Sequence, residues 1–225
     1  MNGKLGVAAP HERGARRSKL HARKLALAAV AISLMVAGPA AASPGNVVNG
    51  GFEEPDIATG SFTYFDSVPG WTAINGCGIE VQDRVAGAPQ EGNQFVELNA
   101  KCKGGITQTI TAFAGTGYVV SFEFSPRPGT QAEDNKVKVL WNGELMETVG
   151  PEPGGSATAW SPHHVAVTAT GPKCGVGPNT LTFKSAGTNP SGGGVGAYLD
   201  DVHFTPTLSA FDRDCDSGTS GKGWG

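Results

Sequence analysis

Short apolar segments separated by turn residues recur along most of this chain. Gln94–Leu98 and Ile106–Ile110, for example, alternate apolar with polar side chains, which is the pattern of a strand with one buried face. Asn142-Gly143 lies between two such segments and is a preferred two-residue β-hairpin turn. No stretch after the N-terminal leader keeps the 3.6-residue period of a long helix. Roughly ten strands at spacings of about 8–12 residues predict an all-β fold, a two-sheet antiparallel β-sandwich or jelly roll.

The first 42 residues have the composition of an export signal. Seven basic side chains precede an apolar run from Leu25 to Ala37, and Ala40-Ala41-Ala42 is a small-residue cleavage site. The apolar run is short for a bilayer span, so we expect a cleaved secretory signal peptide in preference to a retained membrane anchor. Arg16-Arg17 matches the twin-arginine signal weakly, which leaves the export route open. The predicted division is a signal peptide at 1–42, a β-sandwich domain at 43–206 and a polar, glycine-rich tail at 207–225.

Removing the leader makes the chain strongly acidic. The whole sequence has 17 basic and 20 acidic residues, of which the leader takes seven and one, so 10 and 19 remain and the net charge is −9. Such a surface disfavours binding to nucleic acid and to anionic membranes. We therefore expect a secreted protein with no nucleic-acid partner and no membrane span after cleavage.

All four cysteines follow the leader, at positions 77, 102, 174 and 215. An exported chain meets an oxidising compartment, so two disulfides are expected. Three connectivities are open, and we favour Cys77–Cys102 with Cys174–Cys215 because each pair closes a modest loop. Zinc is the alternative, but no pair has Cys-x-x-Cys spacing and no histidine lies at a ligand interval.

Carboxylates near both ends of the predicted domain form a first candidate site. Glu53 follows a glycine-rich turn with exposed carbonyls, and Asp200-Asp201 lies inside an apolar strand. Adjacent carboxylates in such a strand are costly unless a cation or donors satisfy them. If the first and last segments of the domain meet, these oxygens would converge on a hard cation such as Ca²⁺ with a structural role. Neighbouring strand residues point to opposite faces, so we expect only one of Asp200 and Asp201 to bind the cation directly unless a β-bulge intervenes. The alternative to a cation site is that one of the two carboxylates faces solvent and the other caps a turn.

Aromatic residues beside predicted loops form a second candidate site. Tyr64 and Trp160 flank loops, and a flat ring matches the apolar face of a pyranose. Trp71 and Trp141 are better explained by packing in the core or at a turn. Partners for sugar hydroxyls are expected among the polar residues Asn75, Gln82, Asp83, Arg84 and Gln94.

No catalytic motif emerges from the sequence. Neither a Gly-x-Ser-x-Gly elbow nor a His-Glu-x-x-His helix occurs, and the neighbouring His163 and His164 would point to opposite faces of their strand. No pair of acids stands in a recognisable glycosidase motif. The sequence therefore favours a protein that is not an enzyme.

Four short strings occur together along the chain. They are Asn49-Gly50-Gly51-Phe52-Glu53, Val68-Pro69-Gly70-Trp71, Gly115-Thr116-Gly117-Tyr118 with Ser121-Phe122, and Leu199-Asp200-Asp201-Val202. With these strings in this order, the chain over residues 46–206 resembles the galactose-binding-like jelly rolls, and within them the cell-wall family called domain of unknown function 642 and related bacterial exported proteins. The resemblance implies a carbohydrate-binding-module-like sandwich, often with structural calcium between the terminal strands, and plant members are associated with cell-wall polysaccharides.

Together these features favour a secreted, non-catalytic protein that contacts cell-wall or extracellular polysaccharide. One alternative is an extracellular module that docks another protein. Another is a small wall-polysaccharide hydrolase whose site follows no recognisable motif.

Overall fold

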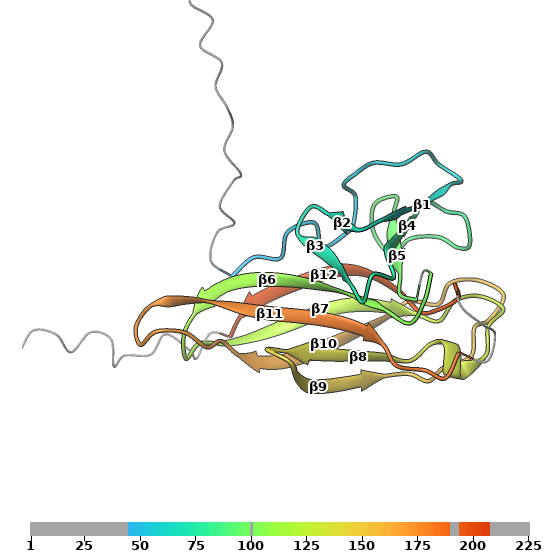
Figure 1. Cartoon of the computed structure of the whole chain (residues 1–225). Coiled ribbons are helices and arrows are strands. Elements are labelled where there is room, and N and C mark those ends of the chain that lie inside the picture. The colour runs from blue at the N-terminus through green and yellow to red at the C-terminus, as the bar shows by residue number, and fades with distance from the viewer. Residues whose placement is uncertain (1–44, 100, 190–193, 208–225) are drawn as a thin grey trace, which may run out of the picture. The chain divides into compact units, whose positions relative to one another are not determined.

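The chain folds almost entirely into β-strands. The computed structural model describes residues 45–99, 101–189 and 194–207, and in these ranges it shows twelve strands and one short 3₁₀ turn, Ala132–Asp134 (Figure 1). No helix in the described ranges is long and apolar enough to cross a membrane. The predicted leader at 1–42 and nearly all of the predicted tail lie outside the described residues.

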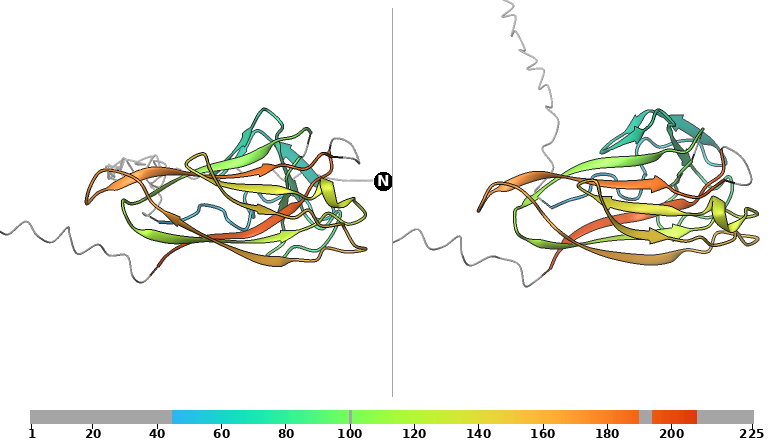
Figure 2. Two further views of the ribbon diagram at one scale, coloured as in Figure 1. Left: turned by 90° about the horizontal axis from the view of Figure 1, so that it is seen from below. Right: turned by 60° about the horizontal axis from the view of Figure 1, so that its bottom comes forward.

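The strands form two six-stranded antiparallel sheets that pack face to face, which confirms the predicted jelly-roll β-sandwich (Figure 2). Sheet A has the order β1-β4-β5-β12-β7-β10, and sheet B has the order β2-β3-β6-β11-β8-β9. The strands of sheet A are β1 (Phe62–Phe65), β4 (Ile79–Gln82), β5 (Phe95–Glu97), β7 (Gly117–Ser125), β10 (Ser161–Thr168) and β12 (Tyr198–Pro206). Those of sheet B are β2 (Ser67–Val68), β3 (Trp71–Ile74), β6 (Gly105–Phe113), β8 (Val137–Trp141), β9 (Glu144–Val149) and β11 (Val176–Ser185).

The apolar residue at every second strand position fills the space between the sheets. Val81, Val96 and Leu199 are fully buried there from sheet A. Trp71 and Phe183 enter from sheet B, with ring centroids 6.0 Å apart. Each such side chain contributes about 1.5–3 kcal/mol when it leaves water, so this face of each strand fixes the register.

The first and last segments of the domain lie side by side, as predicted. The Val202 N–H donates to the Gly50 carbonyl at 3.0 Å, and a Cβ at position 50 would lie 2.0 Å from the Val202 oxygen. Glycine at position 50 is therefore required for this approach. The pairing of β12 with β7 shifts register between Asp200 and His203, and Asp201 takes a left-handed φ of 50° at this bulge.

Two local predictions are also confirmed. Cys77 and Cys102 form a disulfide with a Cα–Cα distance of 5.1 Å. Asn142 and Gly143 join β8 to β9 with φ angles of 51° and 84°, as a tight hairpin turn requires. The other predicted bridge, from Cys174 to Cys215, involves Cys215, which lies outside the described residues.

Candidate functional site

A row of polar side chains crosses the face of sheet A that points away from the core. Tyr64 on β1 pairs with Glu80 on β4, Glu80 pairs with Glu97 on β5, and Glu97 pairs with Tyr198 on β12. Because the residues between them on these strands fill the core, this row faces the opposite side. We call these four residues, together with Gln82 on β4, the outer row.

Two exposed aromatic rings lie at the open end of the outer row, on the edge strand β1. Phe62 and Tyr64 keep 48% and 38% of their surface exposed, and their rings meet edge to face with centroids 5.6 Å apart. The Lys101 ammonium lies 5.0 Å from the centre of the Tyr64 ring. The Tyr64 phenol is hydrogen-bonded to Glu80, and burial followed by the Glu80 charge raises its pKa, so the phenol stays protonated.

Inside the row, one amide group joins two carboxyl groups. Gln82 Nε2 donates to Glu80 Oε1 at 2.9 Å and to Glu97 Oε2 at 2.7 Å. The two glutamates are only 4% and 1% exposed. Buried acids directly opposite each other on neighbouring strands repel when both are ionised.

A single arginine contacts this acid pair. Arg127 Nη1 donates to both carboxylate oxygens of Glu97, at 2.5 and 2.7 Å, and to the Gly194 carbonyl at 3.0 Å. The Gly196 N–H donates to Glu97 at 2.8 Å. Burial, then the neighbouring Glu80 charge, raises the pKa of Glu97 to about 8 even though Arg127 lowers it. Burial also raises the pKa of Glu80.

Gln82 and Tyr198 complete the buried part of the outer row. Their side chains lie within hydrogen-bonding reach of each other, although Gln82 Oε1 and the Tyr198 hydroxyl make no bond of ordinary geometry within the described part of the chain. Burial raises the pKa of Tyr198 above its usual value, so this phenol also stays protonated. Both side chains are buried and belong to the polar interior of the row.

The predicted calcium residues Glu53 and Asp200 both bind one loop, residues 90–94. Glu53 Oε1 accepts the N–H groups of residues 93 and 94, at 2.8 and 2.9 Å. Asp200 Oδ2 accepts those of residues 90 and 91, at 2.8 and 3.1 Å, and its Oδ1 accepts the Asp201 N–H at 2.8 Å. Burial raises the pKa of Asp200 to about 7, although these three N–H groups lower it.

The third predicted ligand, Asp201, pairs with His203 Nε2 at 2.6 Å. In the described ranges, no group of three or more His, Cys, Asp or Glu side chains is arranged to hold a metal ion. A pocket of about 370 Å³ nevertheless lies beside Glu53 and Glu91. Burial and the charges of Glu53 and Asp201 raise the pKa of Glu91 there, which indicates a negative local potential. Structural calcium therefore stays a prediction.

The predicted polar partners of a sugar have different roles in the structure. Gln94 is fully buried, and its side-chain amide bonds the backbone of residues 52, 55 and 57, which gives it a structural role. Asp83 is also buried and accepts bonds from Thr59 and Arg84, at 3.0 and 3.3 Å. Arg84 is partly exposed and also donates to Asn93 at 2.7 Å. These three residues hold the loop beside β4.

Trp160 supports the loops over the outer face of sheet A. Its ring packs edge-on against Phe95 with a centroid distance of 5.7 Å, and its Nε1 donates to the Ala88 carbonyl at 2.9 Å. Phe95 lies on β5 two residues before Glu97 and is fully buried. Trp160 thus covers a second apolar cluster on the outer face of sheet A, while Tyr64 lies on β1 with its ring partly exposed. A role of either ring in ligand binding stays a prediction.

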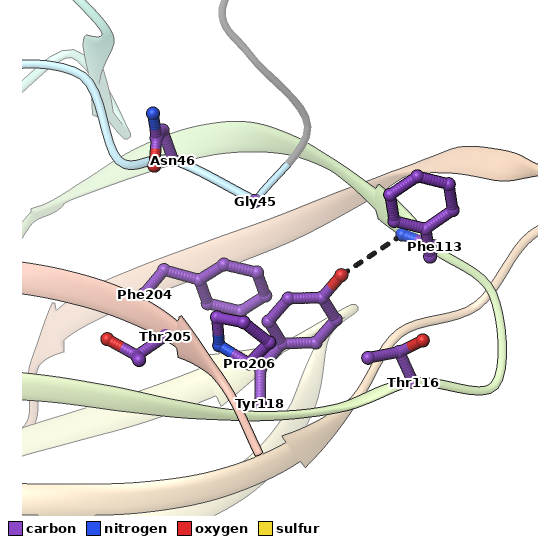
Figure 3. A pocket seen from close by; sticks show the side chains of 8 residues that line it. All are labelled: Gly45, Asn46, Phe113, Thr116, Tyr118, Phe204, Thr205 and Pro206. Atoms are coloured by element: carbon purple, nitrogen blue, oxygen red, sulfur yellow. Dashed lines mark hydrogen bonds between the residues drawn. The ribbon is translucent and has the colours of Figure 1, made fainter. Parts of the chain in front are cut away.

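A separate pocket of about 410 Å³ lies where β6 turns into β7 (Figure 3). Tyr118 and Phe204 form its floor as a stacked pair with centroids 4.2 Å apart, and the Phe113 N–H donates to the Tyr118 hydroxyl at 3.2 Å. Other lining residues include Thr116, Thr205 and Pro206. No sequence pattern indicated this pocket.

Comparison with known proteins shows the fold. No family model matches the chain, and no curated protein matches it. Solved structures do share its fold. A Stig cyclase, FisC, from Fischerella sp. TAU in complex with (3Z)-3-(1-methyl-2-pyrrolidinylidene)-3H-indole is 18% identical, with a TM-score of 0.51 over 72% of this chain and 98% of that chain. An apo form cyclase from Fischerella sp. is 19% identical, with a TM-score of 0.50 over 72% and 97%.

A family 35 carbohydrate-binding module from Clostridium thermocellum is also similar, at 13% identity and a TM-score of 0.41 over 64% of this chain and 97% of that chain. At their identities, the two cyclase matches establish a shared jelly-roll fold. Membership of the domain-of-unknown-function-642 family stays a prediction.

Proposed function

We propose that this chain is a secreted, non-catalytic carbohydrate-binding domain of the cell-wall-associated kind, and that its ligand lies against the outer face of sheet A at the edge strand β1. The observation that carries the proposal is the exposed pair Phe62 and Tyr64 beside the polar outer row. Secretion is supported by the leader-like first 42 residues and by the disulfide between Cys77 and Cys102.

This combination suits a sugar. A pyranose ring has an apolar C–H face that packs on an aromatic ring and a rim of hydroxyls that need donors and acceptors. Tyr64 offers the ring, and its own hydroxyl is already bonded to Glu80, which fixes its position. Lys101, whose ammonium lies 5.0 Å from the centre of this ring, can donate to sugar hydroxyls. A polysaccharide would therefore meet two rings and a hydrogen-bond donor at the exposed edge of sheet A.

A second candidate is an enzyme that uses the acid pair Glu80 and Glu97 as a proton donor. The raised pKa of Glu97 favours this candidate, because acidic side chains with strongly shifted pKa values are frequent at catalytic sites. The two carboxyl groups are almost fully buried, however, so a substrate could contact them only if the loops that carry Arg127 and Gly196 moved away. Binding at the exposed rings needs no such displacement. Activity on wall polysaccharides that disappears in Glu97→Gln would favour the enzyme.

Affinity electrophoresis of the secreted chain in gels containing plant and microbial wall polysaccharides tests the proposal. We expect Tyr64→Ala to weaken retention about tenfold, or ~1.4 kcal/mol, because the stacking surface is lost. Phe62→Ala should weaken retention as well, because Phe62 is the more exposed ring of the pair and packs against Tyr64. The matched control is Leu145→Ala, which removes a side chain that is 55% exposed on β9 of sheet B. Failure of every polymer to retard the wild-type chain would contradict the proposal.

A further inference from the structure

Two carboxyl groups share the buried outer row with one guanidinium. Glu80 and Glu97 lie directly opposite each other, and within the described residues Arg127 is the only cation in contact with either carboxyl group. With both acids ionised, one buried negative charge would lack a counter-ion, which is strongly unfavourable. The charge count therefore calls for one proton on the pair.

No other group facing the pair removes this need. Tyr64 on β1 and Tyr198 on β12 have raised pKa values and stay neutral. Lys101 lies over the Tyr64 ring at the exposed rim and is bonded to neither acid. Asp200, the next outward residue on β12, is held by the loop that includes residues 90 and 91.

The pKa of about 8 describes the loss of the one proton that the two acids share, and the bonding partners place this proton mainly on Glu80. Glu97 accepts two hydrogen bonds from Arg127, one from Gly196 and one from Gln82, all of which favour its ionised form. Glu80 is bonded to the Gln82 amide, the Tyr64 phenol and the Glu97 carboxyl group, and its bond to Glu97 itself requires a proton between the two acids. A neutral Glu80 beside an ionised Glu97 leaves one negative charge for the one guanidinium.

We propose that this single shared proton controls ligand binding: the outer face of sheet A binds its ligand while the proton is present and releases it when the proton is lost. The inference rests on the proposed function and adds a regulation of the same site. Neutral Glu80 holds the Tyr64 ring, and Glu97 holds Arg127 and Gly196 from two covering loops. A doubly ionised pair has to be hydrated, so water enters the row and these positions loosen.

Binding at different pH values tests the inference. The secreted chain is run in native gels containing galactomannan, arabinoxylan or mixed-linkage β-glucan between about pH 6 and pH 9.5. Because one proton is linked to binding, wild-type affinity should fall by at most about tenfold per pH unit above the pKa of the pair. Glu80→Gln is neutral at every pH and keeps the side-chain shape, so its affinity should change less than about twofold over this range. Glu144→Gln, an exposed acid on β9, is the control and should follow the wild type.

Infrared spectra of the ligand-free chain test the proton separately. The wild type should show a carboxylic-acid C=O band at about pH 6 that is lost at high pH, and the part of this band that belongs to the pair should be absent from Glu80→Gln. An identical band in the two proteins would overturn the inference, and so would wild-type retention that does not change with pH. Absence of retention at every pH would instead overturn the proposed function, and the infrared titration would still decide on the proton. If Glu80→Gln does not fold, the wild-type pH profile and band titration decide together.

Discussion

At the scale of single residues, Gln94 shows how a polar side chain can stabilise the fold without facing solvent. Its amide accepts from the Ile57 N–H at 2.7 Å and donates to the carbonyls of Phe52 and Pro55, at 2.7 and 3.2 Å. These bonds attach the first segment of the domain to the start of β5. The sequence pattern predicts that Gln94 lies at the end of a strand, but it does not predict that residues 52–57 lie over its side chain.

Gln94→Ala should therefore destabilise the fold strongly. It removes three bonds and leaves buried backbone groups unsatisfied, so we expect a loss of about 2–3 kcal/mol and a melting midpoint lower by several degrees. Thermal unfolding followed by circular dichroism measures it. Gln90→Ala is the matched control, because the Gln90 side chain is exposed in the same part of the chain. Equal midpoints for the two variants would contradict this role.

At the scale of elements, the strand pattern was largely readable from the sequence, while the covering of sheet A was not. Alternation located strands such as β6 and β7, and Asn142-Gly143 located the β8–β9 hairpin. The same alternation in Gln94–Leu98 predicts a solvent-facing Glu97, and Glu80 lies at the equivalent position of β4. They are buried because Arg127, Gly194 and Gly196 come from loops far away in the sequence, and no local pattern reports such contacts. The only sequence signal for the burial of these two acids was their position inside very short apolar strands.

The disulfide is the main covalent link between elements in the described part of the chain. It joins the turn after β3 to the connection between β5 and β6, with a sequence separation of 25. A disulfide that closes a loop of this length stabilises a fold by about 3 kcal/mol, because it lowers the conformational entropy of the unfolded chain. The double variant Cys77→Ala, Cys102→Ala should lower the urea midpoint accordingly, with a slope that is unchanged or steeper because the unfolded chain becomes less compact. An unchanged midpoint would show that the bridge adds nothing to the stability of the sandwich.

At the scale of the whole molecule, the raised carboxyl pKa values set how stability depends on pH. Burial raises the pKa of Glu97 to about 8 and that of Asp200 to about 7, and it also raises those of Glu80, Glu91 and Glu123. These acids have lower values in the unfolded chain, so the folded state binds more protons between the two values. Their contribution to stability is complete below the unfolded pKa and is lost as pH rises through the folded pKa.

The unfolding free energy should therefore fall as pH rises from about 4.5 to about 8, by an amount on the order of a few kcal/mol. Urea unfolding at half-unit pH steps measures this slope. Glu80→Gln should flatten the upper part of the profile, because the shared proton is no longer lost. Stability that stays constant or rises across this window would contradict the buried acid pair.

The central claim is that ligand binds at the outer face of sheet A, and an NMR titration tests it most directly. The isotope-labelled chain is titrated with oligosaccharides from a polymer that retains it, and the changes in amide chemical shift are mapped on the fold. We predict that the largest shifts occur on β1 and β4 and around Lys101, beside Phe62 and Tyr64. Shifts centred on the pocket of Phe113 and Tyr118, or an absence of shifts at saturating sugar, would contradict the claim.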